Sequence, residues 1–336
     1  MNAAGTLIRV GLLTLASTML LVASSAGQQE AGPAIAAAQA MPAAVTESER
    51  LRLRDGLVAA ENHDWGGLAQ LRDNATSPLV RRMLEWRWAT STDAPLYFDD
   101  IRQALNDLQG WPGRTTMRTR AEQAIFDSRL SADERATFLR QENGPITGDG
   151  RIALASALRE SGQASAATDM ARAAWREDTL TSTAEDRALA TFGESFTQDD
   201  YSDRVSMLLW KQQRSAAQRL LSHVSTADRA VAQARIALQT RQRRHLQAIV
   251  DAVPGSRRDD PGFLYDRAQF RRRTDQPVEA MTLISQIDPR EAPAAARSDI
   301  FKERRLYVPR ALRSRSPPTT PASARPSVSR SPRSRA

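Results

Sequence analysis

The fold of this chain is constrained most by a run of short helical patterns separated only by brief polar breaks. The run is clearest at residues 192–238, where two tight connections join three such patterns. In the first pattern, four apolar residues recur at i, i+4, i+7 and i+8: Tyr201, Val205, Leu208 and Leu209. This spacing puts them on one face of a helix, which Trp210 is expected to end. The stretch therefore predicts packing between helices and carries no catalytic signature of its own.

Two further patterns complete this central stretch. Residues 214–224 give a second apolar stripe, formed by Ala217, Leu220, Leu221 and Val224. Thr226 is the expected cap of a third helix, whose inward residues are Ala227, Val231, Ala234 and Leu238. Alanine side chains let helices approach closely, and each large apolar side chain buried contributes about 1.5–3 kcal/mol.

Helix start signals recur along the rest of the chain. Capping boxes are expected at residues 46–49 and 131–134, and Thr197 with Asp200 forms a weaker one. Asp64 is placed to cap a short helix, and Ser77 precedes a proline at a first helical position. Gly162 breaks a helical hairpin. No segment alternates with period two for long enough to indicate a sheet.

One short helix cannot bury its apolar face alone, whereas stacked helix pairs can. We therefore predict an all-α fold: an irregular α-superhelix, or solenoid, of antiparallel helix pairs over residues 46–312. The repeat is irregular, and no clean 34-residue period is found.

The two ends of the chain differ from this helical region. Residues 1–26 have the pattern of a secretory signal peptide, with Arg9 before an apolar run at 10–23 and small residues at a cleavage site. An uncleaved N-terminal anchor is the alternative, although the run is short for a membrane span. Residues 27–45 are expected to form a disordered leader and residues 313–336 a disordered tail rich in Arg, Ser and Pro. After signal cleavage we expect an exported protein without a transmembrane helix.

Composition excludes several kinds of site. The chain has no Cys, so thiolate metal sites, disulfides and Cys nucleophiles are ruled out, and only three His occur. The net charge of +8 comes from the C-terminal end, because the region from Arg304 onward holds nine Arg and no acidic residue, and +8 less nine leaves −1. A nearly neutral remainder does not indicate a nucleic-acid partner. We expect no metal and no cofactor.

The central stretch resembles the N-terminal superhelical domain of soluble lytic murein transglycosylases. Between residues 192 and 238 the resemblance rests on these residues: Phe192-Gly193, Phe196-Thr197, Asp200, Arg204, Leu208-Leu209-Trp210, Ala216-Ala217, Leu220-Leu221, Arg229 and Ala234-Arg235-Ile236-Ala237-Leu238. Downstream it includes residues 260–267, 271–273 and 301–312. It spans roughly residues 46–312 and is most specific between 192 and 273. The signal peptide agrees with it, because these enzymes act on peptidoglycan in the periplasm.

The resemblance implies cleavage of the linkage between N-acetylmuramic acid and N-acetylglucosamine, which leaves 1,6-anhydro ends. In that family the catalytic Glu lies in a C-terminal lysozyme-like domain, in a motif like RQES.F followed by Gly-Leu-Met-Gln. Arg140-Gln141-Glu142 matches this motif partially. Glu142, however, lies in the superhelical half and no Gly-Leu-Met-Gln segment follows, so we interpret it as a polar residue near the end of the helix that begins at Ser131.

We therefore expect no catalytic, cofactor-binding or metal-binding residue in this chain. The favoured hypothesis is a truncated lytic transglycosylase-like protein of cell-wall metabolism that supplies only the helical part holding peptidoglycan glycan strands, and that is inactive alone. The alternative is a stand-alone periplasmic helical-repeat adaptor that binds a protein partner. For the tail after Leu312 we favour a frameshift or premature end, over a basic tail for anionic wall polymers or an Arg-Ser tail for nucleic acid.

Four further groups of residues have two interpretations each. Asp99-Asp100 and Asp199-Asp200 are adjacent carboxylates, which we interpret as first-turn helix charges rather than a catalytic pair. His63 and His223 are interpreted as surface or helix-end residues. Arg257-Arg258 and Arg271-Arg272-Arg273 could meet wall carboxylates or phosphates, but a solvated helix face is favoured. The tryptophans could stack on sugars, but core packing is favoured for the set Trp65, Trp86, Trp88, Trp111, Trp175 and Trp210.

Overall fold

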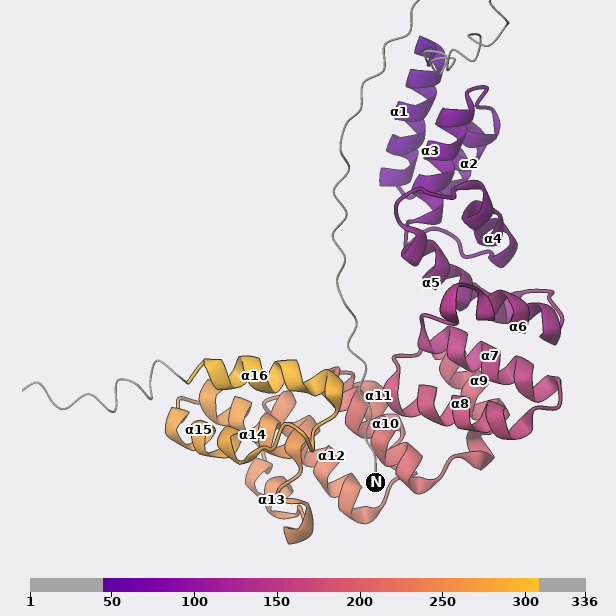
Figure 1. The fold of residues 1–336 in the computed structure, drawn as a ribbon. Coiled ribbons are helices and arrows are strands. Elements are labelled where there is room, and N and C mark those ends of the chain that lie inside the picture. Colours follow the sequence, from indigo (N-terminus) through magenta and orange to yellow (C-terminus); the bar gives the residue numbers. More distant parts are fainter. Residues whose placement is uncertain (1–44, 308–336) are drawn as a thin grey trace, which may run out of the picture. The chain divides into compact units, whose positions relative to one another are not determined.

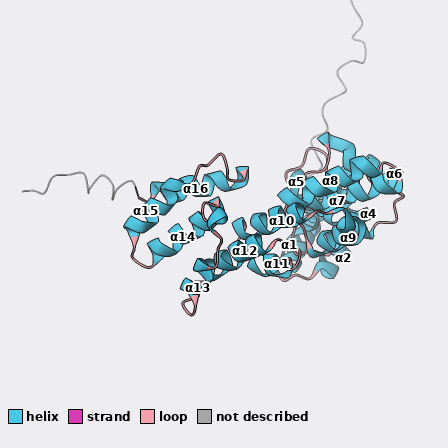
Figure 2. Ribbon diagram, turned by 90° about the horizontal axis from the view of Figure 1, so that it is seen from below, coloured by secondary structure: helices cyan, strands magenta, loops and turns pink. Residues whose placement is uncertain are grey.

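The computed structural model describes residues 45–307, and the regular secondary structure in this part of the chain is helical, with short loops between the helices. It contains sixteen α-helices and five short 3-10 helices, with no strand among the described residues (Figure 2). The predicted all-α class is confirmed. The signal peptide at 1–26, all but the last residue of the leader, residues 308–312 of the predicted superhelix and the tail at 313–336 lie outside the described residues. No helix between residues 45 and 307 combines the length and apolar character that a membrane span requires.

The helices are short and follow closely on one another. The first eight are α1 (Glu47–Glu61), α2 (Trp65–Asp73), α3 (Pro78–Ala89), α4 (Phe98–Asp107), α5 (Arg114–Ala124), α6 (Ala132–Arg140), α7 (Gly148–Glu160) and α8 (Ala164–Glu177). The second eight are α9 (Ser182–Phe192), α10 (Gln198–Trp210), α11 (Arg214–Arg219), α12 (Thr226–Gln239), α13 (Leu246–Asp251), α14 (Pro261–Arg273), α15 (Pro277–Gln286) and α16 (Arg297–Arg305). The 3-10 helices are η1 (Ile125–Asp127), η2 (Gln141–Asn143), η3 (Gly193–Ser195), η4 (Gly255–Arg257) and η5 (Ala294–Ala296).

Helices pack on helices that are near them in the chain. The most extensive contacts join α7 with α8 and α14 with α15, and each of these pairs is a hairpin of neighbours (Figure 1). Other contacts join helices that are separated by a single helix in the chain, as in α1 with α3, α8 with α10 and α12 with α14. Such local packing is the property that defines solenoid proteins, in which each unit is stabilised by its neighbours.

Most of the predicted helix starts are found. Asp64 accepts a hydrogen bond from the Gly67 amide at 2.8 Å, and Ser77 caps α3. Ser131 and Glu134 form a complete capping box. Thr197 and Asp200 form a second one, in which the Thr197 amide donates to the Asp200 carboxylate at 2.7 Å. An aspartate at this position thus closes the box as well as the longer glutamate does.

The structure corrects three details of the central stretch. The second helix, α11, ends at Arg219, and its apolar residues to Val224 lie in turns with i to i+3 hydrogen bonds. The side chain of Arg229 satisfies one carbonyl of these turns, that of Leu221, at 2.8 Å. The cap of the third helix is Ser225 rather than Thr226, since the Ser225 hydroxyl accepts from the Asp228 amide at 3.0 Å. Ala227 is only partly buried.

Buried arginines join the helices, a feature that the apolar pattern did not predict. Arg204 is fully buried and donates to the carbonyls of Trp175 at 3.1 Å and Asp178 at 2.6 Å, and to the Glu185 carboxylate at 3.1 Å. Arg120 donates to four backbone carbonyls between residues 88 and 95. Arg204, on α10, thus holds the end of α8, and Arg120, on α5, holds the end of α3 and the loop that follows it.

Candidate functional site

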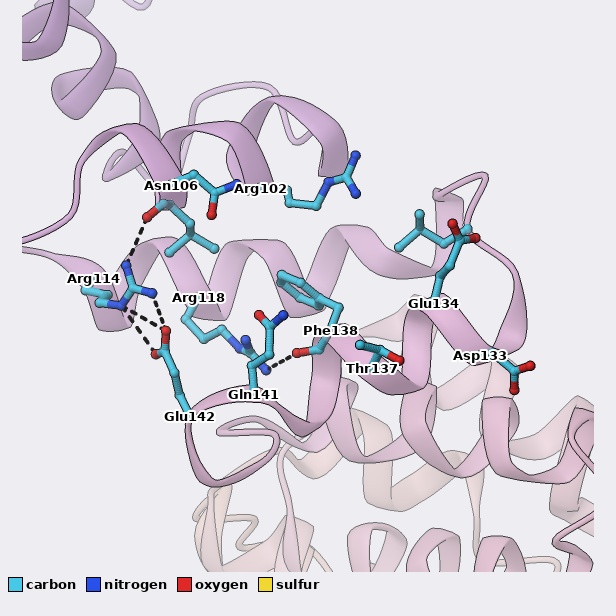
Figure 3. A pocket seen from close by; sticks show the side chains of 12 residues that line it. Arg102, Asn106, Arg114, Arg118, Asp133, Glu134, Thr137, Phe138, Gln141 and Glu142 are labelled. Atoms are coloured by element: carbon cyan, nitrogen blue, oxygen red, sulfur yellow. Dashed lines mark hydrogen bonds and ion pairs between the residues drawn. The ribbon is translucent and has the colours of Figure 1, made fainter.

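A polar pocket of about 430 Å³ lies among α4, α5, α6 and η2, and it contains the one residue that the sequence singled out as a possible catalytic acid (Figure 3). Its lining residues are Arg102, Leu105, Asn106, Arg114, Arg118, Leu130, Asp133, Glu134, Thr137, Phe138, Gln141 and Glu142. The capped start of α6 and the close packing of α4 on α5 position these side chains.

Glu142 follows α6, the helix that Ser131 caps, and lies in η2 with a left-handed backbone at φ 55° and ψ 45°. Its carboxylate accepts from both the Nε and Nη2 of Arg114, and the Nε distances are 3.1 and 3.3 Å (Figure 3). Arg114 also donates to the Leu105 carbonyl at 3.0 Å. The two side chains are 47% and 41% exposed, so this ion pair lies in contact with solvent.

The electrostatics of Glu142 are opposite to those of a catalytic acid. The hydrogen bonds from Arg114 lower the pKa of Glu142, and the charge of the guanidinium adds to this effect. A glutamate that protonates a leaving group at neutral pH needs a raised pKa, which a partly apolar cleft provides. Glu142 is therefore ionised and paired at neutral pH, as the interpretation of a polar residue beyond the helix end requires.

The other charged groups of the pocket also have partners. Arg118 is buried, pairs with Glu122 at 2.9 Å and donates to the carbonyls of Phe138 and Leu139. Asp133 accepts from the Ser161 hydroxyl at 2.9 Å, and hydrogen bonds from Ser131 lower the pKa of Glu134. The pocket offers hydrogen-bonding groups to a polar ligand, but its carboxylates already accept hydrogen bonds from protein groups.

Several carboxyl groups outside this pocket have raised pKa values, and two of them, Asp149 and Asp178, lie close together at positions that the sequence analysis did not single out. Burial raises the pKa of Asp149, although its oxygens accept from the amide and hydroxyl of Thr181. Burial also raises the pKa of Asp178, which pairs with Arg151 at 2.7 Å. Both line an open depression of about 370 Å³. The hydrogen bonds of Asp149 join α7 to the start of α9, and the ion pair of Asp178 joins the end of α8 to α7, so both carboxylates serve in packing.

The acidic pairs singled out in the sequence lie in the first turns of helices, and the two histidines are exposed. Asp99 and Asp100 lie in the first turn of α4, and Asp199 and Asp200 in that of α10, as predicted. Asp200 is fully buried and pairs with Arg172 at 3.5 Å and with Arg176. His63 is exposed beside Asp93. His223 is exposed and its ring stacks on that of Tyr201 at 4.6 Å. Among residues 45–307, no group of three or more potential ligands is arranged to hold a metal ion.

The arginine clusters are partly paired. Arg257 contacts Asp228, Arg272 pairs with Glu303 at 2.6 Å, and Arg271 pairs with Glu279 at 3.2 Å. Core packing is confirmed for Trp88 and Trp175, and Trp175 stacks on Phe196 at 4.9 Å. The remaining four tryptophans are only partly buried: Trp65, Trp86, Trp111 and Trp210.

No model of a known protein family matches the chain, and no significant match is found among curated proteins.

Proposed function

We propose that this chain is a helical scaffold of the lytic transglycosylase type, which holds glycan strands of peptidoglycan outside the cytoplasm without cleaving them. In this proposal residues 1–26 direct export to the periplasm. The catalytic carboxylate belongs to a separate lysozyme-like unit, as the family resemblance implies. The described helices supply binding and positioning.

The observation that carries the proposal is the packing of the residues behind the resemblance. Arg235 and Asp266 come from two separate parts of the quoted pattern, and they form a buried ion pair at 2.8 Å between α12 and α14. Gly262, from the same pattern, lies against this guanidinium: a Cβ built on it would fall 2.4 Å from the Arg235 Cζ. Residues from two separated parts of the pattern thus depend on one another physically, which favours a shared fold over a chance match.

The polar pocket at α4, α5 and α6 is the proposed contact with glycan. Asn106 and Gln141 present amide groups there, which both donate and accept hydrogen bonds and so suit sugar hydroxyl and acetamido groups. Neither side chain has a hydrogen-bond partner among the described residues. These amides supply the groups that recognise the glycan. Because the pKa of Glu142 is lowered, the Glu142 carboxyl group does not act as a proton donor in this pocket.

Retention on purified, protein-free sacculi tests the proposal. We expect the full chain to sediment with sacculi, and the double variant Asn106→Ala/Gln141→Ala to lose most of this retention. Gln198→Ala is the matched control, because Gln198 is an exposed amide on α10 that does not line the pocket. Equal retention of all three proteins would show that this pocket is not the contact with glycan. No retention of the parent chain would refute glycan binding.

A second candidate is an adaptor that binds a protein partner. Leu51 and Val58 are 41% and 47% exposed and lie seven residues apart, on one face of α1. An exposed apolar stripe of this kind suits a partner helix. The same experiment discriminates between the candidates: retention only on envelopes that keep their proteins, with loss on Leu51→Gln/Val58→Gln, favours the adaptor.

A further inference from the structure

A second pocket, of about 230 Å³, lies among α12, α13 and α14 and combines an apolar floor with arginines. Its floor is formed by Leu238, Leu246, Val250 and Phe270. Three arginines line it, Arg243, Arg267 and Arg271, and no acidic residue does. The floor continues into a core cluster that includes Phe263 and Val253. A small apolar cavity with a rim of one charge sign differs from both the buried core and an ordinary solvated helix face.

The arginines of this pocket are not all neutralised by the protein. Arg267 is partly buried, and its guanidinium lies 5.2 Å from the centre of the Phe263 ring, but it forms no ion pair or hydrogen bond with a described residue. Arg243 is exposed and its side chain also has no described partner. Only Arg271 is paired, with Glu279 at 3.2 Å. Two guanidinium groups at the pocket therefore keep their hydrogen-bond donors available.

The surroundings of Arg267 disfavour its charge. Burial lowers the pKa of this guanidinium, and the nearby charges of Arg271 and Arg258 lower it further. Asp251 and Glu279 act in the opposite direction, but both carboxylates have other partners: Asp251 accepts from Gln247 at 2.9 Å, and Glu279 pairs with Arg271. Partial burial of the Arg267 charge beside other positive charges is costly unless an anion enters among them.

We propose that this pocket binds a phosphate ester that carries a short apolar group, with the phosphate on Arg267, Arg243 and Arg271 and the apolar group on the Leu246–Phe270 floor. A phosphate offers more acceptor oxygens and more charge than a carboxylate, and so engages several guanidinium groups at once. The cavity is smaller than the roughly 300–1,000 Å³ of pockets for drug-sized ligands, so the apolar group is small or enters only in part. This inference is independent of glycan binding.

Calorimetric titration of the full chain with hexyl phosphate tests the site, with inorganic phosphate and hexanol as separate probes. We expect hexyl phosphate to bind at least tenfold more tightly than inorganic phosphate and hexanol to give no measurable heat. Arg267→Met keeps the packing on Phe263 and removes the charge, and it should weaken hexyl phosphate binding at least tenfold. Arg273→Met is the matched control, because Arg273 lies on the same helix, is exposed and does not line the pocket.

Three results would overturn the proposal: no binding of hexyl phosphate, equal binding by Arg267→Met, or equal affinity for inorganic phosphate. Far-UV circular dichroism checks that Arg267→Met remains folded. If it does not, Arg243→Gln, on an exposed turn, takes its place, with a weaker but measurable loss expected and an unchanged affinity counting against the site. Sedimentation with phosphatidylglycerol and with phosphatidylcholine vesicles separates the sources. Retention that depends on Arg267 supports a lipid headgroup, and binding of hexyl phosphate without retention supports a soluble ester.

Discussion

Removing one partner of the buried ion pair between Arg235 and Asp266 should destabilise the chain far more than removing both. The two side chains are 2% and 1% exposed, and their atoms approach to 2.8 Å. Asp266→Ala leaves the guanidinium buried without a counterion, which costs about 3–5 kcal/mol in comparable cases. Burial raises the pKa of Asp266 even though Arg235 opposes this, so desolvation of the pair is substantial. A double variant, Arg235→Met/Asp266→Leu, removes both charges and should recover at least half of the loss.

Equilibrium urea unfolding followed by circular dichroism at 222 nm measures this difference. The variants are compared where the slope of unfolding free energy against urea concentration is the same as in the parent chain, because helical arrays do not always unfold in one step. Asp299→Ala is the control: Asp299 pairs with Lys302 at 3.0 Å, but the side chains are 45% and 70% exposed, and such pairs contribute about 0–1 kcal/mol. A loss below about 1 kcal/mol for Asp266→Ala, or a double variant no more stable than the single one, would refute the reasoning.

Three further predictions follow from the same packing. Gly262→Ala should cost about 1–3 kcal/mol in urea unfolding, since its Cβ would meet a buried guanidinium, whereas Gly255→Ala, with open space around it, should have little effect. Asp200→Ala should cost about 1–2 kcal/mol through the lost capping box, and more than Asp199→Ala on the same helix turn. Burial raises the pKa of Tyr265 to about 12, so the unfolded chain releases this proton first and stability falls as pH rises from 10 towards 12. In urea unfolding, Tyr265→Phe should lessen the loss of stability between pH 8 and pH 11. An unchanged loss would count against the raised pKa of Tyr265.

The helices were predictable because their signals are local. Ser131 and Glu134 are three residues apart and determine a helix start between them, whatever else the chain does. The errors are also local in origin. Ser225 is preferred over Thr226 as a cap, and its hydroxyl accepts from the Asp228 amide three residues on. The end of α11 at Arg219 depends on a side chain from the next helix, Arg229, which satisfies a carbonyl of the turn.

The buried arginines and both pockets could not be predicted in this way. Arg204 and Arg235 have the sequence pattern of solvated charges, and their burial depends on carbonyls and carboxylates that converge from other helices. Glu142 matched a catalytic motif by sequence, but its partner Arg114 is 28 residues away, and that pairing decides its pKa. Chemistry in this fold is determined by contacts between helices, which apolar periodicity does not encode.

The most direct test of the central proposal, that the chain holds glycan without cleaving it, is release of muropeptides from purified sacculi. Sacculi are incubated with the full chain, and the soluble fraction is analysed by mass spectrometry for 1,6-anhydro ends. The proposal predicts protein in the sacculus pellet and no anhydro product above a buffer control. Release of anhydro products, lost in the Glu142→Gln variant, would contradict it and make Glu142 catalytic despite its lowered pKa.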